Sequence, residues 1–204
     1  GEDTSGNYTV LLNEETKNDA VNNIITITPK SFTGFTFDSG NPSTYQVTSA
    51  NYQEVIVRYK RNKYTISFNP NGGDATPNQM TGVYYDQVVT LSVNPVPKLT
   101  GHTLVGWTID DTMEEFISGV TKMPNKSITL KAKWRVNTFT VKFNGNGHTS
   151  GLMNDQVVTY GVPTTLNLNE YERVNYIFRG WSKTSTGGGE LLIDGADITN
   201  YQES

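Results

Sequence analysis

Apolar and polar residues alternate along much of the chain, which is the pattern of β-strands with one buried face. Tyr64, Ile66 and Phe68 alternate with polar neighbours, so their side chains lie on one face of a predicted strand. Residues 139–143 repeat the pattern, and an Asn-Gly pair, which supplies the positive φ angles of tight turns, follows both segments. Helix-forming runs are absent from the sequence, and the best candidate for a helix is residues 112–117.

The similarity between these two segments continues downstream at a nearly constant spacing. The matching pairs are Tyr85 and Tyr160, Leu91 and Leu166, Gly106 and Gly180, and Trp107 and Trp181. An identical Asp-Gln-Val-Val-Thr string at residues 86–90 and 155–159 has a different spacing, and we treat it as coincidence because a slipped strand would expose its core face. A more diverged copy covers the start of the chain, where residues 30–37 parallel residues 98–104.

These repeats divide the chain into three modules, residues 1–62, 63–136 and 137–204. Only residues 61–62 and 135–136 remain as linkers, so each closing strand runs almost directly into the next opening strand. We therefore expect a mainly β or α+β fold, with little helix, in which tandem small modules form an elongated, semi-rigid rod.

The third module is expected to lack its closing strand. In module two the closing segment, residues 128–134, follows Trp107, and the same spacing after Trp181 would end beyond Ser204. The start of the chain has neither the basic nor the apolar region of a signal peptide, so we expect a fragment of a longer protein whose export signal and anchor lie outside it.

Composition excludes several classes of function. Charged residues make up 18% of the chain and the net charge is -4, which gives no field that would gather a nucleic acid backbone. The chain has no cysteine, and therefore no disulfide, thiolate nucleophile or cysteine-based zinc site. No apolar run approaches the roughly 20 residues that span a bilayer. We expect no metal, no cofactor and no membrane span in this segment.

Trp107, Trp134 and Trp181 are predicted to be structural. Burying one large aromatic ring removes about 150–250 Å² from water, which matters greatly in a module of this size. Gly106 and Gly180 precede two of these rings and are expected to allow a ring or a neighbouring backbone to approach closely. The alternative, in which the tryptophans are platforms for sugar stacking, stays open.

The remaining polar patterns indicate no catalytic site. His102 and His148 are the only histidines, the residue type suited to acid–base work near neutral pH, and neither lies beside a nucleophile motif. The acidic pairs at residues 110–111 and 114–115 lack the ligand spacing of a calcium loop and are read as solvated turns. Residues 186–190 are glycine-rich without the Lys-Ser/Thr of a phosphate loop, so they are predicted to be a hairpin tip.

Module two resembles the Listeria-Bacteroides repeat, or internalin B-repeat, family. The resemblance rests on Phe-Asn-Pro-Asn-Gly-Gly at residues 68–73, on residues 98–107 ending in Gly-Trp, and on Leu-Lys-Ala-Lys-Trp at residues 130–134. Module three is similar to the same family through residues 143–147 and 173–181. Asn175 stands where the family has glycine, and asparagine is the next best residue at positive φ, so the turn survives.

Module one is similar to repeats of the mucin-binding-protein type, which share this layout. The resemblances imply a β-grasp-like fold, a location on the bacterial cell surface and tandem arrays that act as spacers or adhesive modules. They supply no catalytic residues, and a fold alone names no ligand.

The leading functional hypothesis is a non-catalytic stalk, spacer or adhesion segment that contacts neighbouring modules of its own chain. The alternative is a carbohydrate- or glycoprotein-binding module that recognises a host or cell-wall glycan or protein. Its stacking surfaces would be exposed tyrosines, namely Tyr84, Tyr85, Tyr171 and Tyr176. An enzyme would need a cleft with convergent acids or histidines, which the sequence does not indicate.

Overall fold

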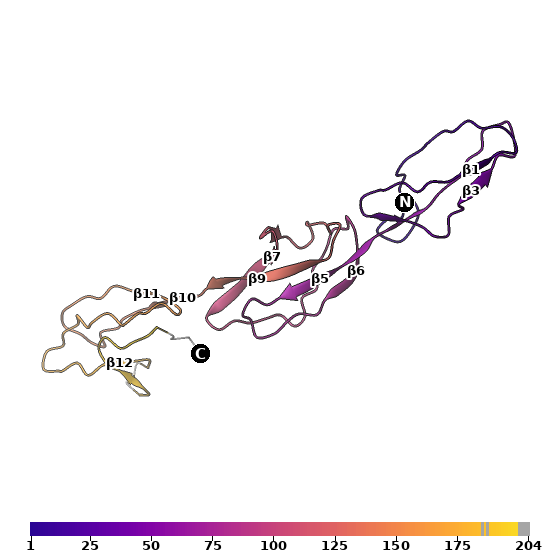
Figure 1. Ribbon diagram of the computed structural model, residues 1–204. Coiled ribbons are helices and arrows are strands. Elements are labelled where there is room, and N and C mark those ends of the chain that lie inside the picture. Colours follow the sequence, from indigo (N-terminus) through magenta and orange to yellow (C-terminus); the bar gives the residue numbers. More distant parts are fainter. Residues whose placement is uncertain (185, 187, 200–204) are drawn as a thin grey trace. The chain divides into compact units, whose positions relative to one another are not determined.

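The computed structural model describes residues 1–184, 186 and 188–199 (Figure 1). Within these ranges the chain consists of β-strands, turns and irregular segments, and it contains no helix. The predicted mainly β fold of tandem small modules is confirmed.

The chain divides into two compact units. One unit comprises Gly1–Pro97 and Gly106–Lys133, and the other comprises Lys98–Val105 and Trp134–Ser204. The first unit contains module one and most of module two. The second contains module three together with residues 98–105 and 134–136 of module two.

Module one is built from two small antiparallel pairs of strands. Strand β1 (Ile24–Thr26) pairs with β3 (Thr44–Gln46), and β2 (Phe35–Phe37) pairs with β4 (Tyr59–Arg61). Tyr59 is only 5% exposed and is the main buried side chain of this module.

The ring of Tyr59 organises the small core of module one. Its centroid lies 4.9 Å from that of Phe32 and 5.4 Å from that of Phe37, both in edge-to-face geometry. The Tyr59 hydroxyl accepts a hydrogen bond from the Lys30 backbone N–H at 2.9 Å. A core with one central aromatic ring is typical of a module of this size, which buries little surface.

Module two forms a single five-stranded sheet. Its strands are β5 (Lys63–Asn69), β6 (Met80–Tyr84), β7 (His102–Ile109), β8 (Glu115–Phe116) and β9 (Ile128–Val136). The spatial order is β6-β5-β9-β7-β8, and β5 is parallel to the central strand β9. The opening and closing strands of the module therefore lie side by side at the centre of the sheet (Figure 1).

The buried face of this sheet follows the alternation seen in the sequence. Ile66 and Phe68 of β5 are 0% and 5% exposed, and Leu130 of β9, which lies opposite Phe68, is 0% exposed. Trp107 of β7 is 7% exposed, and its ring meets that of Phe68 edge-on at 5.0 Å. These residues form the core of module two.

Module three keeps the pairings of module two in a less extensive sheet. Strand β10 (Thr138–Val141) pairs with β11 (Gln156–Thr159), and β12 (Trp181–Ser182) pairs with β13 (Leu191–Leu192). The registers correspond across the two modules. Phe139 lies opposite Val158 as Tyr64 lies opposite Val83, and Trp181 lies opposite Leu192 as Trp107 lies opposite Phe116.

A separate cluster of apolar side chains forms the core of module three. Val158, Leu166, Ala196 and Ile198 are buried, and partly buried residues pack around them. These surrounding residues are Phe139, Val141, Phe143, Trp181 and Leu192.

The expected helix at residues 112–117 is wrong. Glu115 and Phe116 form β8, which pairs with Thr108 and Trp107 of β7. Phe116 is 5% exposed, so pairing against β7 buries its ring, and this tertiary contact overrides the weak local helical signal.

The expected match of Leu91 with Leu166 is also wrong. Thr165 forms an isolated bridge with Asp197, as Val88 does with Lys122. Leu166 therefore takes the place of Val89 in module two, and both residues are buried. The extra residues before Leu166 are accommodated in the loop after β11.

The predicted positive φ angles are confirmed. Asn71 and Gly72 have φ of 48° and 91°, and Asn146 and Gly147 have φ of 45° and 81°. Asn175 adopts φ of 63°, as its glycine-like position requires. The Asn-Gly pair does not close a two-residue hairpin, however, because residues 70–79 separate β5 from β6.

Candidate functional site

The joint between modules one and two is a closely packed and hydrogen-bonded structure. Asn62, which lies between β4 and β5, donates its backbone N–H to the Gly34 carbonyl at 2.9 Å, and its own carbonyl accepts from the Tyr85 N–H at 2.8 Å. The Asn62 Oδ1 accepts a hydrogen bond from Thr36 Oγ1 at 2.7 Å. The rings of Phe35 and Tyr85 meet edge-on at 6.4 Å. We call this set of contacts the first joint.

Arg61 adds contacts that are specific to the first joint. Its Nη1 donates to the Tyr85 carbonyl at 2.9 Å, and its guanidinium carbon lies 4.8 Å from the centre of the Phe35 ring. Its backbone N–H and Nε donate to the side chain and the carbonyl of Glu2.

The second unit contains the same arrangement, which we call the second joint. Asn137 follows β9 and donates its backbone N–H to the Gly101 carbonyl at 2.8 Å, while its carbonyl accepts from the Tyr160 N–H at 3.0 Å. The Asn137 Oδ1 accepts from Thr103 Oγ1 at 2.7 Å. The His102 and Tyr160 rings meet edge-on at 6.1 Å, as Phe35 and Tyr85 do.

Both joints require glycine, because a tyrosine ring lies directly against the backbone. A Cβ added at Gly34 would lie 1.9 Å from Tyr85 Cδ1, and one at Gly101 would lie 2.0 Å from Tyr160 Cδ1. Both glycines also have positive φ, of 77° and 70°. Each tyrosine ring therefore sits where any side chain would collide with it.

The sequence reasoning did not single out the residues that make the joints. Thr36, Asn62, Thr103 and Asn137 carry the repeated hydrogen bonds. The detectable signal was a Gly-aromatic-Thr string in modules one and two and an Asn before each opening strand. The expected linker at residues 135–136 belongs to β9, so a single asparagine forms each connection.

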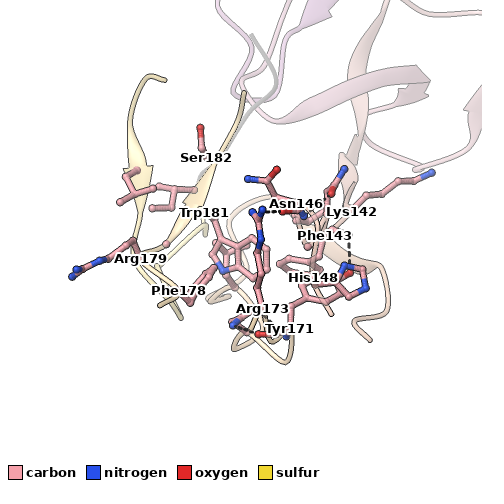
Figure 2. Close-up of a pocket in the computed structure, with 18 of the residues that line it drawn as sticks. Lys142, Phe143, Asn146, His148, Tyr171, Arg173, Phe178, Arg179, Trp181 and Ser182 are labelled. Carbon is pink, nitrogen blue, oxygen red and sulfur yellow. Dashed lines mark hydrogen bonds between the residues drawn. The ribbon is translucent and has the colours of Figure 1, made fainter. Parts of the chain in front are cut away.

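Besides the joints, the second candidate site is a groove of about 1040 Å³ in module three (Figure 2). It is lined by residues 139–146, by residues 176–184 and by the segments that carry His148 and Tyr171. Figure 2 shows the Trp181 ring between Phe178 and Phe143, whereas Arg179 and Lys142 point away from the ring cluster.

Aromatic rings in edge-on or tilted contact form the wall of the groove. The Trp181 centroid lies 4.9 Å from Phe143, 5.0 Å from Phe178 and 6.4 Å from Tyr171. The Tyr171 ring also contacts that of His148 at 4.4 Å. This is the packing of a hydrophobic core that is partly open at one side.

Polar groups in the groove come from the side chains around this wall. Arg173 places its guanidinium carbon 4.0 Å from the centre of the Tyr176 ring, and its Nη1 donates to the Asn146 carbonyl at 3.0 Å. The Trp181 Nε1 is buried and, among the described residues, has no hydrogen-bond acceptor. A buried N–H without a partner is uncommon in folded proteins and costs free energy.

The four candidate tyrosines have different surroundings. Tyr85 lies in the first joint, and Tyr84 is half-buried with Lys63 Nζ 4.5 Å from its ring centre. Tyr171 is half-buried and donates its hydroxyl to the Phe143 carbonyl at 3.0 Å. Tyr176 is 65% exposed, and it lines the groove together with Tyr171.

Gly106 and Gly180, which were predicted to allow a close approach, differ in the space around them. A Cβ at Gly180 would lie 2.5 Å from the Leu192 carbonyl oxygen, which is the expected close approach. At Gly106 that expectation is wrong, because a Cβ there would have open space around it. Trp134 of β9 is half-buried, as is Trp181.

The acidic pairs contact lysines. Asp110 lies near Lys131, Asp111 near Lys126 and Glu115 near Lys133, in exposed ion pairs of the second module. The hydrogen bond from Lys126 lowers the pKa of Asp111, and that from Lys133 lowers the pKa of Glu115. Such exposed pairs contribute little to stability.

Neither a metal site nor a membrane-spanning helix occurs in the part of the chain that the structure describes. No group of three or more His, Cys, Asp or Glu side chains there could hold a metal ion. No helix in the same residues is long and apolar enough to cross a membrane.

The expected hairpin tip at residues 186–190 lies partly outside the described residues, because residue 187 is not described.

The Listeria-Bacteroides repeat domain matches the chain twice, at residues 64–133 and 139–201. The chain belongs to the Listeria-Bacteroides repeat family. The two matched repeats are the ones with corresponding strand registers, and Asn137 of the second joint lies between them.

Two curated relatives of this Listeria-Bacteroides repeat chain come from Evansella cellulosilytica. One is named as a membrane protein and is 27% identical over 81% of the chain; the other is named as a Gly-rich membrane protein and is 28% identical over 72% of the chain. The aligned region spans 25% and 17% of the length of these relatives. No solved structure gives a significant match.

Proposed function

We propose that this chain is a non-catalytic segment of a bacterial cell-surface protein, where it acts as a spacer. The observation that carries the proposal is the recurrence of one joint between successive modules. Asn62 and Asn137 make the same three hydrogen bonds, and Tyr85 and Tyr160 pack on equivalent glycines. A spacer needs connections that resist bending, and a joint with one intervening residue and no free linker meets this need.

The comparisons support this role without naming a partner. Repeat units occupy most of the chain, and the relatives that share them are named as membrane proteins of much greater length. Location outside the cell, and a neighbouring anchor elsewhere in the protein, are part of the proposal. The modules proposed to form the spacer are residues 1–62, 63–136 and 137–204.

The topology of module two supports the β-grasp arrangement that the family resemblance implied. Its opening and closing strands, β5 and β9, form a parallel central pair, and the remaining strands flank them. We propose that module one is a diverged relative with the mucin-binding type of layout. It supplies Gly34 and Thr36 to the first joint as module two supplies Gly101 and Thr103 to the second.

The spacer proposal is tested by the spread of distances across the first joint. The chain has no cysteine, so spin labels can be attached at Asn51→Cys and Thr90→Cys, two exposed positions in the first unit. We expect a narrow distance distribution from double electron–electron resonance. Tyr85→Ala with Thr36→Val should broaden it, because the ring contact and the hydroxyl hydrogen bond are both lost.

Val120→Ala is the control for this experiment, since Val120 is a 66% exposed residue of module two and takes no part in the first joint. It should leave the distribution narrow. A wild-type distribution as broad as that of the double variant would contradict a spacer with fixed joints.

A glycan- or glycoprotein-binding module is the second candidate, and the groove of module three favours it. Tyr171 and Tyr176 both line the groove, beside the cationic side chain of Arg173. A glycan array probed with the wild type and with Tyr176→Ala separates the two functions. A spacer alone binds no glycan, whereas a binding module loses signal when Tyr176 is replaced.

A further inference from the structure

The two joints differ at the residue that precedes the connecting asparagine. In the first joint this residue is Arg61, and in the second joint it is Val136. The hydrogen bonds of the asparagines and the packing of a tyrosine ring on a glycine repeat almost unchanged in both joints. The second joint therefore shows how the first would be built without its arginine.

Arg61 connects three segments of the first unit. Its backbone N–H donates to Glu2 Oε2 at 2.8 Å, and its Nε donates to the Glu2 carbonyl at 2.9 Å. Its Nη1 donates to the Tyr85 carbonyl of module two at 2.9 Å. The guanidinium carbon also lies 4.8 Å from the centre of the Phe35 ring, which is within the range of a cation–π contact. One side chain of β4 thus binds to module one and to module two at the same time.

The hydrogen bond from Arg61 fixes the tyrosine that fills the first joint. Tyr85 donates its backbone N–H to the Asn62 carbonyl at 2.8 Å. Arg61 binds the carbonyl of the same tyrosine, so the peptide groups on both sides of the Tyr85 Cα are held. This bond is partly buried and its donor is charged, and such bonds stabilise more than neutral ones do. Arg61 therefore acts on the joint through the backbone of Tyr85.

The second joint has no counterpart of this bond in the described part of the chain. Val136 has an aliphatic side chain without a donor, and it is 38% exposed. No side chain of the described residues donates a hydrogen bond to the Tyr160 carbonyl. The Nδ1 of His102 forms a hydrogen bond of 2.9 Å with the Thr100 carbonyl, which belongs to its own segment, so this bond does not cross the joint. Tyr160 is held in the joint by its N–H and its ring, but not by its carbonyl.

We propose that Arg61 is a positioning residue that locks the first joint, and that the second joint opens roughly tenfold more often than the first. Opening means that the asparagine loses its backbone hydrogen bonds and that the tyrosine ring leaves its glycine, while the modules on either side stay folded. This inference rests on the joints of the spacer proposed above. It adds that the spacer yields at its second joint before its first.

Hydrogen exchange of the intact 204-residue chain, followed by NMR, measures how often each joint opens. The N–H groups of Asn62 and Tyr85 report on the first joint, and those of Asn137 and Tyr160 report on the second. All four donate to backbone carbonyls at 2.8–3.0 Å, so their exchange compares the joints and not the geometry of the bonds. We expect protection factors about tenfold higher in the first joint. Equal protection of the two joints overturns the proposal.

The amides of the β10–β11 pair separate opening of the second joint from unfolding of module three. They should be more protected than the amides of Asn137 and Tyr160, because the joint opens while the module stays folded. If all of these amides exchange at the same protection factor, module three unfolds as a unit, and the proposal is overturned.

Arg61→Val makes the first joint resemble the second. It should lower the protection of the Asn62 and Tyr85 amides about tenfold and leave the amides of the β1–β3 and β5–β6 pairs unchanged. Lys60→Val is the matched control, because it removes a positive charge from the neighbouring position of β4, where the Lys60 side chain pairs with Asp38. It should leave the protection of the joint unchanged. An equal loss of protection in the β1–β3 pair after Arg61→Val would mean that Arg61 stabilises the whole module, which overturns its role as a lock.

The reverse substitution, Val136→Arg, tests the arginine without weakening the first joint. Its guanidinium should bind the Tyr160 carbonyl and raise the protection of the Asn137 and Tyr160 amides roughly threefold. The gain is smaller than tenfold because Arg61 is also anchored by Glu2. No gain would assign the difference between the joints to other residues and overturn the proposal. A broad distance distribution across the first joint would contradict the spacer, whereas the ratio of protection factors tests the lock alone.

Discussion

Single residues determine how successive modules are connected. Asn62 and Asn137 each use a backbone N–H, a backbone carbonyl and a side-chain oxygen in the same way. Because no other residue separates the flanking strands, these contacts replace a linker. The tyrosine rings beside them lie against the backbone of Gly34 and Gly101, where any side chain would collide with the ring. This contact explains the glycine in the Gly-aromatic-Thr string of modules one and two.

The requirement for glycine can be tested with two substitutions at similar φ. Gly101 and Gly161 have φ of 70° and 74°, but only Gly101 faces a tyrosine ring. Both alanine variants pay about 1–2 kcal/mol for the left-handed backbone. Gly101→Ala should cost about 1–3 kcal/mol more, because Tyr160 must move. Chemical denaturation of the two variants measures the difference, and equal losses of stability would contradict a packed joint.

A second residue-scale prediction concerns acid stability in module one. The hydrogen bond from Tyr8, with further contributions from the Gly40 N–H and Lys60, lowers the pKa of Asp38 to about 2. The same hydrogen bond raises the pKa of Tyr8 to about 12. Since the folded-state pKa of Asp38 is depressed, its stabilising contribution is present above about pH 4 and is lost as the pH falls toward 2.

Asp38→Asn should therefore lower the urea midpoint of module one at pH 5 and have a smaller effect near pH 2. The amide resonances of β2 and β4 report unfolding of this module at each pH. Tyr8→Phe, which removes the donor and keeps the ring, should reproduce part of the change. A difference between wild type and Asp38→Asn that stays constant from pH 5 to 2 would contradict the role of this carboxylate.

At the scale of elements, the sequence predicted the strands whose apolar residues alternate and missed those that tertiary contacts create. Tyr64, Ile66 and Phe68 were predictable because one face of β5 is buried. Strand β8 was not, because Glu115 and Phe116 have no strand pattern of their own and extend only by pairing with β7. The joints and the groove were not predictable either, since their residues come from segments that meet only after folding.

The central strand β9 should carry much of the stability of module two. Leu130 is 0% exposed and lies opposite Phe68, so Leu130→Ala leaves a cavity and should cost about 2–5 kcal/mol. Val105→Ala in β7 is the control, because Val105 is 45% exposed and its truncation should cost about 0.5 kcal/mol or less. Urea unfolding followed by the fluorescence of Trp107 compares the two. Similar losses would mean that β9 is not central to this core.

At the scale of the whole molecule, the three modules share a plan but differ in the extent of strand pairing among the described residues. Module two has a continuous sheet, module one has two short pairs of strands, and module three has two short pairs beside an open groove. The prediction from the spacing after Trp107 and Trp181, that module three lacks its closing strand, stays a prediction. The residues in which the expected closing segment would begin, 200–204, lie outside the described part of the chain.

Asn175 makes module three differ from modules one and two at the position where each of those contacts a tyrosine. Gly34 and Gly101 leave room for a tyrosine, whereas Asn175, at the corresponding place in module three, carries a Cβ, and Ile177 replaces the threonine. A tyrosine ring placed against residue 175, as Tyr85 lies against Gly34 and Tyr160 against Gly101, would therefore collide with the Asn175 Cβ.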